Sequence, residues 1–220
     1  MVRPDRPGQE RRMSMILIKN GRVVDPVTGT DQVLDVLLEG DRIKKVREEL
    51  EDSGAQVLDA KGLVVAPGLM DAHVHFRDPG FTYKEDIETG ARAAARGGFT
   101  TVVCMANTKP AADHPDILRY VQEKAEKTKI HVLQAAAVTK GLRGEELVDM
   151  KALADAGAPG FTDDGIPLVD EKLLLEAMKQ AAALGLPISL HEEDPLLIKG
   201  AGVHQGAVSE KLGYGGAARA

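Results

Sequence analysis

Two histidines separated by one residue follow an apolar segment that is typical of a buried strand. His73 and His75 lie shortly after the apolar residues 63–70. Because side chains two positions apart project from one face of a strand, the two imidazoles are expected to point the same way, and Arg77 continues this row if the strand persists. Two imidazoles can share a metal ion, and an arginine beside them can bind a carboxylate. Alone, such a pair is a weak signal, because two histidines can also simply end a core strand.

Strand-like and helix-like segments alternate through the second part of the chain. The sequence predicts strands at about 67–75, 100–105, 130–137, 159–162 and 187–191, and helices at about 84–97, 114–128, 144–156 and 170–185. Such alternation is typical of parallel βαβ units and predicts an α/β fold. In these folds the functional residues gather at the carboxyl ends of the strands.

Polar or metal-binding residues follow four of the five predicted strands. They are His73, His75 and Arg77 after the first, Asn107 after the second, Asp163 and Asp164 after the fourth, and His191 after the fifth. This set of nitrogen and oxygen ligands suits zinc or a similar divalent ion. Metal-bound water loses a proton near neutral pH and can then attack an amide carbonyl. The predicted chemistry is metal-assisted hydrolysis of an amide, with Arg77 and Asn107 orienting a substrate that bears a carboxylate.

Composition narrows the class of protein further. The 220 residues carry a net charge of -6 and a single cysteine, Cys104. This mild acidity argues against nucleic acid or an anionic membrane as the main partner. One cysteine excludes an internal disulfide and suits a reducing compartment, and the apolar neighbours of Cys104 predict a place in the core. No apolar stretch reaches membrane-spanning length, so a cytoplasmic location is expected.

The chain is expected to divide into three regions. Residues 1–14 are rich in arginine and proline and are predicted to form a disordered tail. Residues 15–66 predict a small β module of short strands, with a turn at Asn20-Gly21. Its apolar residues are too few for a convincing independent domain. Residues 67–220 form the predicted α/β region.

Four motifs together resemble the bacterial type I dihydroorotases, which belong to the amidohydrolase superfamily. They are His73-Val74-His75-Phe76-Arg77-Asp78-Pro79-Gly80, Asn107-Thr108-Lys109-Pro110, Phe161-Thr162-Asp163-Asp164-Gly165 and His191-Glu192. The likeness runs from about Met15 to Ala220. It implies an α/β fold that is an incomplete TIM-type barrel, with about five of eight strands, preceded by a small β-sandwich. The implied reaction is reversible hydrolysis of (S)-dihydroorotate to N-carbamoyl-L-aspartate in pyrimidine (UMP) biosynthesis.

The resemblance also implies a metal centre with two zinc ions in a complete site. His73 and His75 are similar to the family's ligands of the first zinc. Asp164, by its spacing to His191, resembles the bridging carboxylate, and Asp163 is the less favoured of the pair. His191 resembles a ligand of the second metal.

The same resemblance implies how the substrate is held and which protein is a partner. Arg77 and Asn107 are similar to the clamp on the substrate carboxylate. The implied partner is aspartate carbamoyltransferase, in an oligomeric assembly. Dihydropyrimidinases and allantoinases, the alternative cyclic amidases, share the histidine pair but usually carry a carboxylated lysine where this sequence has Asp164.

Two residues of the family pattern find no counterpart before Ala220. They are a metal-binding histidine after strand six and an aspartate after strand eight, which is the family's general acid/base. No catalytic acid or base is therefore assigned within this chain, and we expect no turnover by the 220-residue chain alone. It is expected to be an N-terminal part, a truncated reading frame or half of a split enzyme. The alternative is a non-catalytic dihydroorotase-like subunit that scaffolds aspartate carbamoyltransferase.

Overall fold

The structure is a computed structural model that describes residues 14–198 and 202–217. The chain divides into two units, Met1–Pro67 and Gly68–Ala220. Apart from Ser14, the predicted tail lies outside the described residues, so its state stays a prediction.

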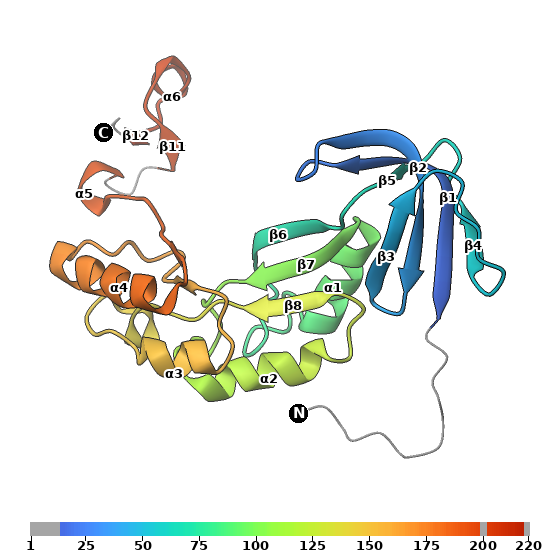
Figure 1. The fold of residues 1–220 in the computed structure, drawn as a ribbon. Coiled ribbons are helices and arrows are strands. Elements are labelled where there is room, and N and C mark those ends of the chain that lie inside the picture. The colour runs from blue at the N-terminus through green and yellow to red at the C-terminus, as the bar shows by residue number, and fades with distance from the viewer. Residues whose placement is uncertain (1–13, 199–201, 218–220) are drawn as a thin grey trace. The chain divides into compact units, whose positions relative to one another are not determined.

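The first unit is a single five-stranded sheet (Figure 1). Its strands are β1 (Met15–Asp25), β2 (Thr30–Glu39), β3 (Arg42–Arg47), β4 (Gln56–Asp59) and β5 (Val64–Val65). β1 pairs antiparallel with β2 and parallel with β4 and β5, and β2 pairs antiparallel with β3. Leu17, Leu37 and Leu50 form a small buried cluster in this unit. The prediction was a small sandwich, which needs two facing sheets, whereas residues 14–67 form one.

The Asn20-Gly21 pair is not a turn, contrary to the sequence prediction. β1 runs through both residues, and its pairing with β2 shifts between Ile18 and Gly21. Asn20 has a φ of 61°, which asparagine tolerates better than most residues. Its backbone N–H donates to Asp35 Oδ1 at 2.8 Å. The pair therefore forms a bulge within a long strand rather than a hairpin turn.

Parallel strands form the framework of the second unit. They are β6 (Leu69–Val74), β7 (Phe99–Cys104), β8 (His131–Gln134), β9 (Phe161–Thr162) and β10 (Ile188–Ser189). β6, β7 and β8 form one parallel sheet, β9 and β10 form a parallel pair, and a parallel bridge between Ala136 and Phe161 joins the two sets. The five predicted strands are thus present in the predicted order, although four of them are shorter than predicted.

Four main helices alternate with these strands. They are α1 (Ile87–Arg96), α2 (Pro115–Ala125), α3 (Met150–Asp155) and α4 (Glu171–Leu184). A side chain accepts a hydrogen bond from a free backbone N–H at the start of each helix: Asp86, His114, Asp149 and Asp170 respectively. The shorter elements are a 3-10 turn (Lys140–Leu142), α5 (Pro195–Ile198), β11 (Val203–His204), α6 (Ala207–Leu212) and β12 (Gly216–Ala217).

The helix predicted at 144–156 begins six residues late. Its first part instead pairs with the segment after β8: the N–H of Lys140 donates to the carbonyl of Glu146, and the N–H of Val148 to that of Val138. These bonds satisfy the backbone outside a helix. Asp149 then accepts from the N–H of Ala152 at 2.9 Å and starts α3.

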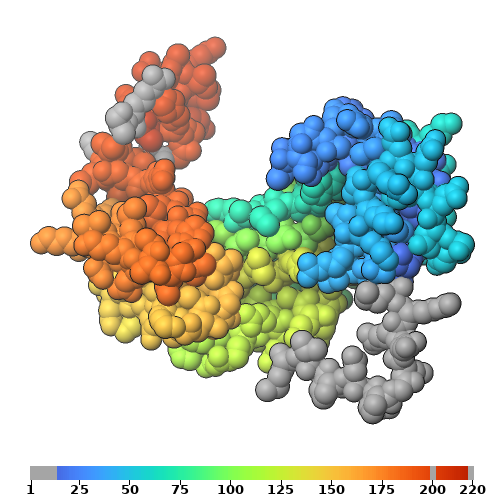
Figure 2. All heavy atoms as spheres, in the orientation of Figure 1, coloured from blue at the N-terminus to red at the C-terminus, as the bar shows by residue number. Residues whose placement is uncertain are grey.

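Two buried clusters support the second unit. In the first, α1 and α2 pack against β7 and β8 through Ile87, Val102, Cys104, Val121 and Val132. In the second, Leu153 of α3 and Ala177 of α4 pack with Phe161, and the space-filling view shows the atoms of α3 and α4, amber and orange, in contact (Figure 2). The predicted core position of Cys104 is confirmed, and burial raises the pKa of its thiol to about 12.

None of the helices within residues 14–198 and 202–217 is both long enough and apolar enough to cross a membrane.

Candidate functional site

The two histidine rings converge at the carboxyl end of β6. His73 lies within the strand, and His75 is the first residue beyond Val74, where the strand ends. Their Nε2 atoms are 3.3 Å apart, and the rings meet edge to face with centroids separated by 5.1 Å. The backbone N–H of His73 donates to Asp71 Oδ1 at 3.0 Å. Two imidazole nitrogens are therefore presented to one point in space.

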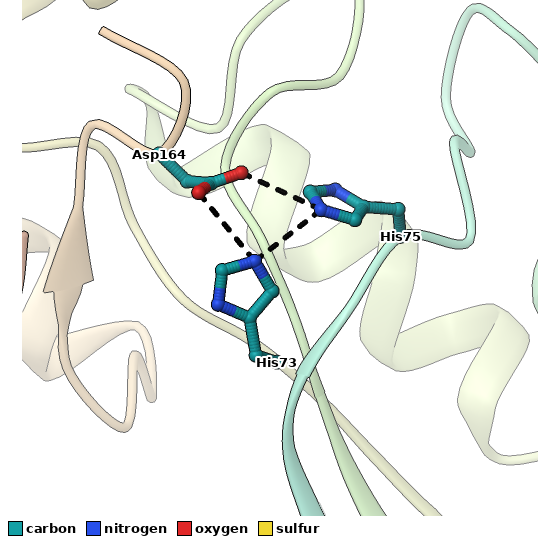
Figure 3. A group of neighbouring side chains, drawn as sticks. All are labelled: His73, His75 and Asp164. Atoms are coloured by element: carbon teal, nitrogen blue, oxygen red, sulfur yellow. Dashed lines mark hydrogen bonds and ion pairs between the residues drawn. The ribbon is translucent and has the colours of Figure 1, made fainter. Parts of the chain in front are cut away.

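The carboxylate of Asp164, two residues after β9, completes a group of three (Figure 3). Its Oδ1 is 3.4 Å from His73 Nε2, and its Oδ2 is 3.5 Å from His75 Nε2. These separations are too long for good hydrogen bonds. Ligands bound to zinc at 2.0–2.1 Å with tetrahedral angles lie roughly 3.3 Å from one another. The spacing of this group, whose ligand atoms all lie within 4.8 Å of one another, therefore fits a shared metal ion.

Asn107, which follows β7, connects two members of this group. Its Oδ1 accepts a hydrogen bond from His75 Nδ1 at 3.0 Å, and its Nδ2 donates to Asp164 Oδ2 at 3.0 Å. Because Nδ1 of His75 is the donor, Nε2 carries the lone pair that a metal requires. From the sequence Asn107 was expected to contact the substrate. Its contacts to both candidate ligands join residues 32 and 57 positions apart, so no local pattern predicts them.

Arg77 reaches the site from a turn rather than from the strand. β6 ends at Val74, and Arg77 has a φ of 60°. The strand therefore does not persist to Arg77, and the condition under which Arg77 would continue the histidine row is not met. Its Nη1 nevertheless donates to Asn107 Oδ1 at 3.5 Å, a long contact that places the guanidinium beside the amide of Asn107. Arg77 is half-buried, which leaves part of it open to a ligand.

His191 lies at the margin of the group. β10 ends at Ser189, two residues earlier. The Nδ1 atom of His191 is 3.8 Å from Asp164 Oδ1, and its Nε2 is 3.2 Å from Glu193 Oε2. His191 thus approaches the carboxylate that the two other histidines face, and Glu193 contacts its second nitrogen.

Asp163 has a different environment from its neighbour Asp164. Its Oδ1 accepts from the N–H groups of Val138 and Thr139 at 2.7 and 3.1 Å, and its Oδ2 accepts from the Thr139 hydroxyl. Burial raises the pKa of this carboxyl even though these hydrogen bonds oppose the change. Asp163 therefore ties the end of β9 to the segment after β8, and Asp164 is the aspartate that faces the histidines.

Three further histidines lie in other settings. His114 caps α2, His131 begins β8 at its amino end, and His204 lies in β11. None of the three belongs to the His73–His75–Asp164 group identified among the described residues.

The sequence is similar to known proteins over most of its length. A family model described as Dihydro-orotase-like matches residues 62–218. The dihydroorotase of Clostridioides difficile (strain 630) is 57% identical over 204 residues, which cover 92% of this chain and 48% of that protein. The dihydroorotase of Streptococcus pneumoniae serotype 4 is 58% identical over 181 residues, covering 82% and 43% respectively. The chain spans about half the length of the curated relatives it matches.

Solved structures share the fold. An L-hydantoinase (dihydropyrimidinase) from Arthrobacter aurescens aligns with a TM-score of 0.71 and 25% identity, covering 86% of this chain and 42% of that one. A crystal structure of a dihydroorotase aligns with a TM-score of 0.59 and 18% identity, covering 83% and 52%. At this low identity the second likeness concerns the fold alone.

Proposed function

The chain belongs to the dihydro-orotase-like family, and from this premise we propose that the whole protein is a dihydroorotase. Its reaction is the reversible hydrolysis of (S)-dihydroorotate to N-carbamoyl-L-aspartate in pyrimidine biosynthesis. The observation that carries this proposal is the convergence of His73, His75 and Asp164 from two separate strand ends. Hydrolysis of a cyclic amide is a reaction that such a ligand set supports.

We propose that the metal is zinc, with two ions in a complete site. His73 and His75 hold the first, Asp164 bridges, and His191 contributes to the second. Two imidazole nitrogens and a carboxylate oxygen within 4.8 Å of one another are a donor set that zinc favours. A zinc ion held by these residues would lower the pKa of bound water towards neutrality and would polarise an amide carbonyl. Asn107 holds His75 and Asp164 in place through its two hydrogen bonds.

The substrate carboxylate is held by Arg77, with Asn107 beside it. A guanidinium offers a planar pair of donors that matches a carboxylate. The contact between Arg77 and Asn107 places this donor pair next to the candidate metal ligands. The metal ligands lie where the amide bond is hydrolysed, and Arg77 beside them binds the carboxylate that orients the substrate. We assign no residue of this chain the role of general acid or base.

Several finer features follow the same proposal. The parallel strands β6–β10 are part of a TIM-type barrel, which is supported by their order and by the structural likeness to the hydantoinase.

The protein works in the cytoplasm as an oligomer with aspartate carbamoyltransferase. Affinity purification from source cells tests this partnership. Recovery of the carbamoyltransferase without any hydrolytic activity would favour the non-catalytic scaffold instead.

A different cyclic amidase is the second candidate, because hydantoinases are among the structures with the same fold. Substrate choice separates the two. If Arg77 binds a carboxylate, dihydroorotate is hydrolysed and dihydrouracil, which lacks that group, is not. Turnover of dihydrouracil at a similar rate would overturn the dihydroorotase assignment.

The central experiment measures zinc content and hydrolysis together. The whole wild-type protein, rather than the 220-residue chain alone, is expected to retain zinc and to form N-carbamoyl-L-aspartate. In the same whole protein, His73→Ala is expected to weaken zinc affinity by more than about 100-fold, which is the largest loss usual for removing an outer-shell partner of a metal ligand. His131→Ala, which removes an exposed histidine at the opposite end of a strand, is the matched control and retains zinc. Equal zinc content in both variants would contradict the proposed ligand set.

A further inference from the structure

The residue after Arg77 is a buried carboxylate with partners on a distant helix. Asp78 has a fully buried side chain, with 0% of its surface exposed. Its Oδ1 accepts from the Tyr120 hydroxyl at 2.7 Å, and its Oδ2 accepts from Lys124 Nζ at 2.7 Å. Both partners lie on α2, 42 and 46 residues further along the chain. A buried charge is retained only when it is paired and hydrogen-bonded, and both oxygens of Asp78 meet this condition.

The turn that holds Arg77 needs such support. Arg77 is not glycine, yet it adopts a φ of 60°, a conformation that persists only where the surroundings fix it. The carbonyl of Arg77 accepts from the N–H of Phe81 at 2.8 Å, and the carbonyl of Pro79 accepts from the N–H of Lys109 at 3.1 Å. A side chain at Gly80 would lie 2.1 Å from the carbonyl oxygen of Lys109. The turn is therefore pressed against the segment that carries Asn107.

We propose that Tyr120 and Lys124 act through Asp78 as positioning residues for Arg77, and so set the affinity of the site for the substrate carboxylate. The inference rests on the proposed function of Arg77. α2 fixes Asp78 from outside the site, and Asp78 fixes the backbone of its neighbour, which directs the guanidinium to Asn107. In the described part of the chain, none of the metal-ligand candidates contacts Tyr120 or Lys124. Substituting Tyr120 or Lys124 is therefore expected to affect Arg77 and not metal binding.

The geometry of Lys124 supports a specific pairing. Its ammonium lies 4.8 Å from the centroid of the Tyr120 ring as well as against Asp78. Burial opposes the charge on Lys124, yet the hydrogen bonds to Asp78 and Tyr120 outweigh this and leave its pKa raised. Lys127, three residues further on, is exposed and makes no ion pair with any described residue. The two lysines therefore provide a matched comparison.

Hydrogen exchange in the purified protein tests the positioning directly. Tyr120→Phe and Lys124→Gln are expected to speed amide exchange in residues 76–84 by about tenfold, the effect of losing roughly one hydrogen bond to a charged group. Lys127→Gln and Tyr214→Phe, which alter exposed residues elsewhere, leave it unchanged. Lys124→Arg retains the charge and restores most of the protection. Tyr120→Phe keeps the ring and the lysine, so the test does not depend on how well Lys124→Gln folds.

Binding supplies the second readout. The dissociation constant of (S)-dihydroorotate, measured by calorimetry on zinc-loaded protein, is expected to rise about tenfold in the two variants with no change in zinc content. Unchanged exchange at 76–84, or faster exchange across the whole chain, would overturn the positioning role. Failure of the whole wild-type protein to bind dihydroorotate would overturn the proposed function instead, while the exchange data would still decide whether α2 fixes the turn.

Discussion

Asp163 and Asp164 are adjacent carboxylates whose surroundings give them different tasks. Asp163 is 2% exposed and accepts hydrogen bonds from two backbone N–H groups and a hydroxyl. Asp163→Ala leaves those donors buried and unsatisfied, which is expected to lower the free energy of unfolding by about 3 kcal/mol. Asp163→Asn keeps an acceptor and is expected to cost about 1 kcal/mol or less. Chemical denaturation measures both. An alanine variant as stable as the asparagine variant would show that the hydrogen bonds are not structural.

The pH dependence of stability follows from the same burial. The pKa of Asp163 is raised above its ordinary value by desolvation. A carboxyl with a raised pKa in the folded state contributes stability that is fully present below its unfolded pKa of ~3.9, and that contribution is lost as pH rises through the folded pKa. Wild type should therefore lose stability relative to Asp163→Asn as the pH rises above about 4, where the unfolded carboxyl ionises. Denaturation across a pH series measures the difference in stability between the two proteins, and a constant difference would argue against the raised pKa.

Strand-end residues were predictable from the sequence because they depend on local pattern. An apolar run followed by His-x-His, and another ending in Asp-Asp-Gly, can be recognised within a few residues. The contacts of Asn107 and the Asp78–Tyr120–Lys124 cluster could not be predicted in this way. They join residues 32 to 57 positions apart, and their partners are fixed only when the helices pack on the strands.

The boundaries of the helices and strands depend on competition for backbone hydrogen bonds. α4 begins where the sequence predicts it, at about residue 170. The Oδ1 atom of Asp170 accepts from the N–H groups of Lys172 and Leu173 at 2.9 and 3.1 Å and so caps this helix. The late start of α3 and the bulge at Asn20 were not predicted, because hydrogen bonds to residues distant in the sequence determine both features. Local signals thus give the type and order of the elements, and tertiary hydrogen bonds set their ends.

The cap of α4 gives a direct test. Asp170→Ala is expected to lower the free energy of unfolding by about 1 kcal/mol, the usual value for an N-cap. Asp155→Ala, which removes an exposed ion pair with Lys151, is the matched control and is expected to cost about 0.5 kcal/mol or less. Thermal or urea unfolding of the two variants measures the difference. Equal losses would show that the Asp170 contacts add little to helix stability.

Among the described residues, the second unit leaves apolar strand surface exposed. β6 is an edge of its sheet, and Leu69 and Met70 are 54% and 64% exposed. Parallel sheets are normally covered on both faces, and exposed edges promote association. We therefore expect the purified 220-residue chain to bind a hydrophobic dye and to sediment as a species larger than a monomer.

A pair of substitutions locates the cause of that association. Met70→Glu places a charge on the exposed edge and is expected to reduce both dye fluorescence and sedimenting mass, since a charged side chain opposes edge pairing. Val27→Glu changes a residue that is 92% exposed in the turn between β1 and β2, and is expected to alter neither. Single exposed apolar residues of this kind are normal on protein surfaces. If both variants behaved like wild type, the association would arise from another surface. If the wild-type chain were monomeric and bound no dye, the chain would adopt a different conformation in solution, in which the β6 edge is covered.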